Sequence, residues 1–375
     1  MGISASIVVM TPLVYADAGD GTCLAFAIAT VTYILVAIQV NVFAGRIATP
    51  GSLHTFVTEA LGPRAGSVAG WMLLLGYVSF LPAYFVGIPY YAIAGLRGMF
   101  GESTGILVPT APDMAVLGGL VAAAGGWISL RDIRVSTRAI MAVEFVTLGM
   151  IAAMAARYFL GAGIHADALQ FQPVDVGARP FGSGLILAMS CFFGFEACSV
   201  LGVEAKSPLT MIPRANMMTV ILTGTAIVAF SYAVVQAFHA HGLNMAEADH
   251  PVMVFADMLG LGSVVPAILG GVAISGFGCI LGTLNTGGRL LYSLSRQCSF
   301  LGFATLTHQR HRTPYVASAV LAAVGLAATL LMLANDLRVP DIIGSCATFG
   351  AFGFMTAYVM CSVGATVHLL RHGTP

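Results

Sequence analysis

The sequence predicts an all-α integral membrane protein with about ten membrane-spanning helices. Of its 375 residues, 58% are hydrophobic and only 9% are charged, and the mean hydropathy is +0.91. A soluble protein carries roughly 25% charged residues, so this chain has too few charges to cover a water-facing surface. Its apolar residues also form blocks of about twenty or more, the length that crosses a bilayer core of about 30 Å.

Hydropathy in windows of about 19 residues locates the individual spans. They lie near residues 22–45, 67–96, 113–130, 139–161, 182–203, 214–240, 262–293, 315–335 and 342–370. The stretch from Ile3 to Tyr15 is also apolar but too short to span. We therefore expect the chain to begin partway through a first helix that is incomplete here, as in a fragment or an incomplete gene product.

The spans divide into two sets of five when the partial first segment is included. In both sets the third span is long and the fourth is short. An odd number of spans per half inverts one half relative to the other in the membrane, as in many secondary transporters. The predicted parts are a first five-helix repeat at 1–161, an outer loop at 162–181, a second repeat at 182–371 and a cytoplasmic tail at 372–375.

The basic residues predict the orientation. If the loop after residue 45 is cytoplasmic, twelve of the sixteen Lys and Arg residues face inward, and most acidic residues face outward. This is a strong positive-inside bias. We expect a multi-pass protein of the cell membrane, surrounded by the lipid bilayer, and of the inner membrane if the source is Gram-negative.

Several functions are excluded or disfavoured. Sixteen basic and sixteen acidic groups give no net charge to attract nucleic acid, and no basic run is present. The seven cysteines are odd in number and lack CxxC spacing, so they are interpreted as small buried residues. An intramembrane enzyme is a disfavoured alternative, because no HExxH motif is present and no catalytic residue or cofactor is predicted.

Two groups of histidines are candidate metal sites, but neither has a companion ligand at helical spacing. No metal site is predicted, and both groups are interpreted as loop residues. They are His239, His241 and His250 on the outer side, and His308 and His311 on the inner side.

Two acidic residues lie well inside predicted spans, and such groups are functional candidates because burying them costs several kcal/mol. Glu196 lies ten residues before Lys206, or about 15 Å along a helix, which places it near the membrane midplane. It either carries protons or joins two helices through hydrogen bonds. Glu144 lies six residues after Arg138, about 9 Å deep, as a second proton site or an arginine partner.

Two stretches predict interrupted helices. Gly194 lies among bulky aromatic residues at the membrane centre, where a helix break exposes backbone N–H and C=O groups to a ligand; close helix packing is the alternative. The small residues Ser4, Ala5 and Ser6 precede an apolar half-helix, whose N-terminal amides attract an anion such as a carboxylate.

Four stretches, in this order along the chain, resemble the amino acid–polyamine–organocation permeases. They are Pro50-Gly51-Ser52 with Ala60-Leu61-Gly62-Pro63, Gly194-Phe195-Glu196-Ala197 with Ile212-Pro213-Arg214-Ala215, Leu284-Asn285 with Arg289-Leu290-Leu291-Tyr292, and Arg312-Thr313-Pro314. In the family, these motifs belong to the loop after the second helix, the sixth helix and its following loop, the end of the eighth helix and the start of the ninth.

This resemblance implies a five-plus-five inverted repeat with broken first and sixth helices, and alternating access for an amino acid or related amine. It further implies that the first helix binds the substrate carboxylate and the sixth its amine. The implied substrate residues are Ser4, Ala5, Ser6, Ile7, Phe192, Phe193, Gly194 and Phe195, and Glu196 and Glu144 are the proton-coupling candidates. Family members usually carry glycines where this chain has Ser4-Ala5-Ser6, a departure that bears on the carboxylate site.

Further polar residues are candidates for the cavity lining. Tyr84, Ser275 and Asn285 lie within the third and eighth spans, although Ser and Asn also join helices and the third-span aromatics Tyr77 and Phe80 are interpreted as packing. The leading function is a secondary transporter of an amino acid or amine, coupled to protons or to a counter-substrate. A truncated or non-transporting homologue that acts with a partner is the alternative.

Overall fold

A computed structural model describes residues 2–49, 51–100, 109–129, 134–162, 167–171, 177–248, 250–296, 302, 304, 306 and 314–373. Within these ranges the chain forms helices and no strand. The α-helices are α1 (Ile3–Ala18), α2 (Thr22–Ala44), α3 (Ser52–Leu61), α4 (Pro63–Phe100), α5 (Ala111–Ser129), α6 (Arg134–Ala162), α7 (Ala178–Ser190), α8 (Pro208–Ala240), α9 (Pro251–Met258), α10 (Val265–Ser295), α11 (Tyr315–Ala334) and α12 (Val339–His372). Short 3₁₀ helices are η1 (Gly19–Gly21), η3 (Ala168–Phe171), η4 (Phe195–Glu204), η5 (Met245–Glu247) and η6 (Gly262–Val264).

The predicted membrane class is confirmed. In the described part of the chain, nine stretches are long and apolar enough to cross a membrane, and they coincide with the predicted spans. The first of them, Ile3–Ala44, contains both α1 and α2, which are separated where Gly19 adopts a φ of 54°. Helices suit this environment because they satisfy their backbone hydrogen bonds internally, without water.

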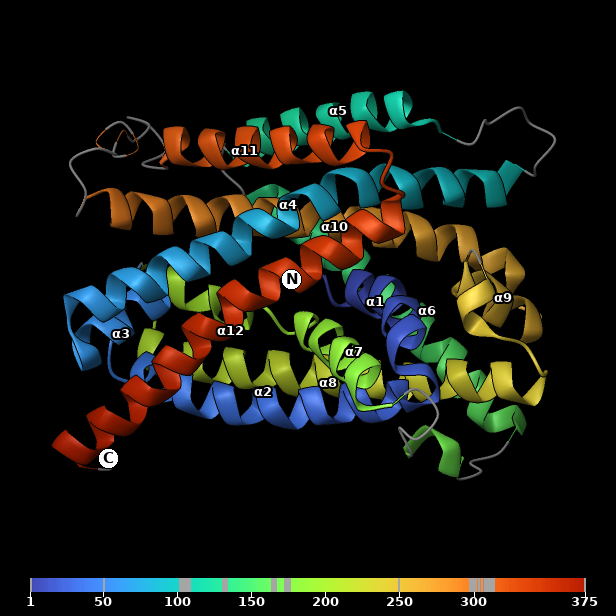
Figure 1. The fold of residues 1–375 in the computed structure, drawn as a ribbon, viewed down its shortest axis with the longest axis horizontal. Helices are drawn as coiled ribbons and strands as arrows, with labels where there is room; N and C mark the ends of the chain where they lie inside the picture. The colour runs from blue at the N-terminus through green and yellow to red at the C-terminus, as the bar shows by residue number, and fades with distance from the viewer. Residues whose placement is uncertain are drawn as a thin grey trace.

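The helices form layers around a few long central elements (Figure 1). α4 and α10 pack against each other and α12 packs across α4, while α5 and α11 lie side by side on the outside of α4. α2 and α8 form another contacting pair, and the short helices α1 and α7 lie between these groups. The N-terminus of α1 is therefore at the centre of the molecule.

Apolar side chains also cover the outside, as expected for helices that face lipid. Val31 and Leu35 on α2 are each 59% exposed, and Leu331 on α11 is 66% exposed. Exposed apolar residues repeated along several helices would promote aggregation of a soluble protein, but they match a hydrocarbon environment.

α12 approaches α4 closely because glycines face each other at the crossing. A Cβ atom added to Gly353 would lie 2.7 Å from the backbone nitrogen of Gly76 and closer still to the Met72 carbonyl oxygen. No side chain fits at this position, and small residues at such contacts are typical of membrane helices. The close contact fixes the position of α12 beside the centre of the protein.

The predicted break in the sixth span is confirmed. α7 ends at Ser190, residues 191–194 form turns, and the chain continues as η4. Gly194 has a φ of 78°, a conformation that glycine adopts without strain. At the first span, Ser4, Ala5 and Ser6 were expected to precede the half-helix. Instead, α1 already begins at Ile3 with Gly2 as its N-cap, and these three residues lie in its first turn.

Two short helices were not predicted, α3 after the second span and α9 before α10. Both are shorter than a membrane span, so a window of about 19 residues does not detect them. The division into two five-helix repeats stays a prediction, since the described helices alone do not test how the halves are related.

Candidate functional site

A cavity of about 70 Å³ lies where α1, α4, α10 and α12 meet the end of α7. A single water needs roughly 10–15 Å³ on the same scale, so the space corresponds to about five to seven water-sized positions. The lining residues are Gly2, Ala5, Ser6, Val9, Met10, Tyr77, Phe80, Ala83, Tyr84, Gly87, Ile88, Ser190, Cys191, Phe193, Val272, Gly276, Cys279, Thr283, Ile343 and Phe354. None of them is charged, so an ion bound here depends on hydroxyl and backbone groups.

The end of α7 brings the backbone of Ser190 and Cys191 to the cavity. The N–H groups of Cys191, Phe192 and Phe193 donate to the carbonyls of Ala188, Met189 and Ser190, which tightens the last turn. The Ser190 hydroxyl donates to the Leu187 carbonyl at 2.6 Å. The carbonyls at the helix end are thereby occupied as far as Ser190, and Cys191 is the next residue along, in the cavity lining.

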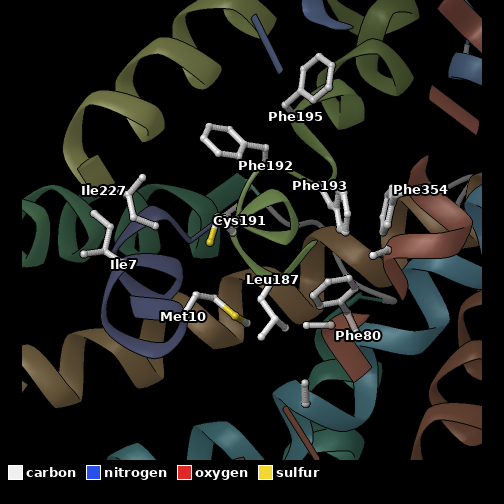
Figure 2. Packing of buried hydrophobic residues seen from close by; sticks show 14 of the residues in the cluster. Ile7, Met10, Phe80, Leu187, Cys191, Phe192, Phe193, Phe195, Ile227 and Phe354 are labelled. Atoms are coloured by element: carbon white, nitrogen blue, oxygen red, sulfur yellow. The ribbon is translucent and has the colours of Figure 1, made fainter. Parts of the chain in front are cut away.

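Three aromatic rings form one side of the cavity. Phe193 stacks on Phe354 with ring centroids 4.8 Å apart, and Phe80 lies 6.1 Å from both rings. Figure 2 shows these three rings beside Cys191, with Leu187 and Met10 close by. The turn after α7 therefore directs Phe193 toward α4 and α12, and gives the cavity an apolar surface.

Phe192 and Phe195 point away from these rings (Figure 2). Both pack on Tyr33 of α2, with ring centroids 5.1 Å and 6.1 Å from it. They line a separate small space of about 10 Å³. Of the predicted substrate residues, Ala5, Ser6 and Phe193 line the main cavity, whereas Ser4, Ile7, Phe192, Gly194 and Phe195 do not.

Glu196 is fully buried and lies behind the cavity. Tyr77 of α4 donates its hydroxyl to Glu196 Oε1 at 2.8 Å, and Tyr358 of α12 donates to Oε2 at 2.5 Å. The Tyr358 oxygen in turn accepts the Gly194 N–H at 3.0 Å. The carboxyl group thus joins α4, α12 and the break after α7, and Tyr77 connects it to the cavity, whose lining it shares.

Glu144 contacts the N-terminal end of α1. Its Oε1 accepts the Ser4 N–H at 2.8 Å and its Oε2 accepts the Ser4 hydroxyl at 2.9 Å. The partner of Glu144 is therefore the first turn of α1, while an arginine partner was one of the two predicted roles. The described part of the chain provides no ion pair for either glutamate.

The three remaining candidates differ in position. Tyr84 lines the cavity. Ser275 lies against the N-cap of α1, because a Cβ atom on Gly2 would overlap its hydroxyl oxygen. Asn285 is not among the lining residues, and its side chain donates to the Leu281 carbonyl of the same helix at 2.6 Å.

Several lining residues were not predicted from the sequence, among them Met10, Cys191, Cys279 and Phe354. Tyr77 and Phe80, interpreted as packing, also line the cavity. Apolar and sulphur-containing residues occur throughout the spans, so their types carry no signal for a cavity. A polar aromatic residue deep in a span, as at Tyr358, is the feature that could have indicated a partner for Glu196.

The interpretation of the histidines as loop residues is wrong for His239, which lies in the last turn of α8. Its ring nitrogens contact Asp20 at 2.7 Å and Asp167 at 3.0 Å. His241 and His250 lie outside helices, whereas His308 and His311 lie outside the described residues. Within the described ranges, no group of three or more His, Cys, Asp or Glu side chains is arranged to hold a metal.

Known proteins match almost the whole length of this chain. The sequence model of the amino acid permeases matches residues 1–367. The branched-chain amino acid permease BcaP of Bacillus subtilis (strain 168) is 24% identical, over 97% of this chain and 77% of its own length.

Two further relatives differ in what their names say they carry. The low-affinity putrescine importer PlaP of Escherichia coli (strain K12) is 24% identical, over 81% of this chain and 66% of its own length. The serine/threonine exchanger SteT of Bacillus subtilis (strain 168) is 23% identical, over 79% and 65% respectively. These relatives are named as transporters, not as enzymes.

Proposed function

We propose that this chain, which belongs to the amino acid permease family, is a secondary active transporter of an amino acid with an uncharged side chain. Transport would proceed by alternating access between the predicted repeats 1–161 and 182–371, in the cell membrane. The observation that carries the proposal is the uncharged cavity, which lies between the start of α1 and the end of α7.

The size and chemistry of the cavity support an amino acid of this class. About five to seven water-sized positions suit a ligand no larger than a single amino acid and exclude a peptide or nucleoside. Phe80, Phe193 and Phe354 provide an apolar surface for its side chain. A substrate with an additional charge on its side chain would have to bury that charge without a partner among the lining residues, which is costly.

The two charged groups of an amino acid match the two helix ends. The N-terminus of α1 carries the positive end of its helix dipole, and Ala5 and Ser6 of its first turn line the cavity, so the carboxylate is favoured there. The ammonium group then lies toward Cys191 at the end of α7, where backbone carbonyls accept hydrogen bonds.

Glu196 is the proposed proton-coupling group. It is a carboxyl group buried at membrane depth, and Tyr77 links it to the cavity by one hydrogen bond. A change in its protonation alters its bonds to α4 and α12 together, which provides a route from proton binding to helix movement.

The experiment is uptake of radiolabelled amino acids into proteoliposomes, with and without an inward proton gradient. We expect gradient-driven accumulation by the wild type, and loss of accumulation but not of amino acid counterflow in Glu196→Gln. Glu247→Gln, a change in an exposed residue of η5 that bonds to Asn244, is the matched control and should behave like the wild type. A folded wild-type protein that shows neither uptake nor counterflow with any of the amino acids would refute the proposal.

A further inference from the structure

The carboxylate of Glu144 occupies part of the helix end that is proposed to receive the substrate carboxylate. Both of its oxygens are used, one by the Ser4 N–H at 2.8 Å and one by the Ser4 hydroxyl at 2.9 Å. In this arrangement both Ser4 groups donate to the carboxylate, which accepts at both oxygens. A negative charge from α6 therefore already lies at the positive end of the α1 dipole.

A second feature indicates that this helix end can hold another anion. The Ser275 hydroxyl is buried, with 2% of the residue exposed, and has no hydrogen-bond partner among the described residues. It lies directly against Gly2, the N-cap of α1, and Gly2 lines the cavity. A buried hydroxyl donor without a partner is costly, and a carboxylate bound in the cavity beside Gly2 would satisfy it.

We infer that Glu144 and the carboxylate of the substrate compete for the start of α1, so that the substrate binds together with a proton on Glu144. The inference rests on the proposed transport of an amino acid. The proton comes from the solution on the side of substrate entry, neutralises the Glu144 carboxylate and leaves after the substrate. The two carboxylates then never share the helix end in their ionised forms, and this coupling links substrate binding to proton binding.

The surroundings of Glu144 leave few other titratable groups to produce the same effect. α6 packs against α1, α8 and α10. Among the described residues of these helices, the titratable group that interacts with Glu144 is the Cys279 thiol, which accepts the Gly2 N–H at 3.1 Å. Glu196 has separate hydrogen-bond partners in Tyr77 and Tyr358.

The test measures the KM for L-leucine in counterflow, with equal pH on both sides of the vesicle, from pH 5.5 to 8.5. L-leucine is the probe because the cavity surface is apolar and a relative is named as a branched-chain amino acid permease. For one linked proton, the wild-type KM should rise by up to about tenfold per pH unit on the alkaline side. In Glu144→Gln, an uncharged side chain of the same size, the KM should not change with pH.

Isopentylamine tests whether the substrate carboxylate causes the pH dependence, because it has the ammonium group and side chain of leucine but no carboxylate. Its inhibition constant should stay constant over the same pH range in both proteins. A pH indicator provides a second readout, since purified wild type should take up about one proton per leucine bound and Glu144→Gln should take up none.

Each control has a defined outcome. Glu247→Gln, a change in an exposed residue of η5, should keep the wild-type dependence of KM on pH. The inference is overturned if folded Glu144→Gln keeps that dependence, or if isopentylamine shows the same dependence as leucine, and in either case the proposed transport function survives. Absence of counterflow from the folded wild type with every amino acid would overturn both.

Discussion

Glu196, Tyr77, Tyr358 and the Gly194 N–H form a hydrogen-bonded group, here called the Glu196 cluster. Replacing Tyr358 with phenylalanine tests whether this cluster holds the centre of the fold together. The hydroxyl donates to Glu196 Oε2 at 2.5 Å and accepts the Gly194 N–H at 3.0 Å, so the variant loses two hydrogen bonds. Its matched control is Tyr77→Phe, which loses only the 2.8 Å bond to Glu196 Oε1. Both tyrosines are buried, so neither substitution exposes the cluster to water.

The expected losses of stability differ between the two variants. When Glu196 is ionised, a hydrogen bond to it contributes about 1.5–3 kcal/mol, and a buried N–H left without a partner costs about 1–3 kcal/mol. Tyr77→Phe should therefore lower the free energy of unfolding by about 2 kcal/mol, and Tyr358→Phe by about 4 kcal/mol. The additional loss in Tyr358→Phe measures the cost of leaving the Gly194 N–H at the helix break without its acceptor.

The assay is unfolding of purified protein in mixed micelles by a denaturing detergent, followed by circular dichroism. A double-mutant cycle of Tyr358→Phe with Glu196→Gln should give a coupling energy of about 1.5 kcal/mol or more, since the two groups are in contact. Equal losses in the two tyrosine variants, or a coupling below about 0.5 kcal/mol, would refute the view that this cluster fixes the break.

Three further changes follow from the geometry. Gly353→Ala should destabilise the protein by about 3 kcal/mol in the same unfolding assay, because the added methyl group meets α4 backbone that cannot move aside as a side chain can. Gly194→Ala should cost about 1–2 kcal/mol, because an alanine is strained at a φ of 78°. Burial raises the pKa of Asp167, but hydrogen bonds, first from His239, lower it overall below its ordinary value. Asp167 therefore stabilises the fold at pH values above the ordinary pKa of a carboxyl group. The difference in melting temperature between wild type and Asp167→Asn should disappear as the pH falls through the lowered pKa of Asp167.

The sequence predicted most of the fold, because each membrane span has to carry its own signal. A lipid environment requires long apolar helices, and hydropathy detects these directly. The break at Gly194 could also be predicted, because a glycine among bulky aromatic residues at membrane depth is conspicuous in the sequence. The short helices α3 and α9 gave no such signal, because their stability comes from packing against longer helices.

The site was predicted less completely, because its lining consists of ordinary residues brought together by packing. Glu196 was found since a carboxyl group is rare within a span, but its partners Tyr77 and Tyr358 are 281 residues apart in sequence. Phe192 and Phe193 are adjacent in sequence, yet only Phe193 lines the main cavity. Which of the two points inward depends on the turn at 191–194, and that turn could not be derived from residue types alone.

The charges at the site also determine how transport should respond to the membrane potential. An amino acid with an uncharged side chain is a zwitterion, and the cavity lining contributes no charge of its own, so the net charge that moves inward with it is that of the coupled protons. A potential of 100 mV, negative inside, supplies about 2.3 kcal/mol per charge, which corresponds to roughly 50-fold accumulation at equilibrium. A potassium gradient with valinomycin should therefore drive leucine accumulation by the wild type but not by Glu196→Gln. Uptake that ignores the potential and requires amino acid inside the vesicle would instead establish obligatory exchange and contradict the proton-coupled mechanism.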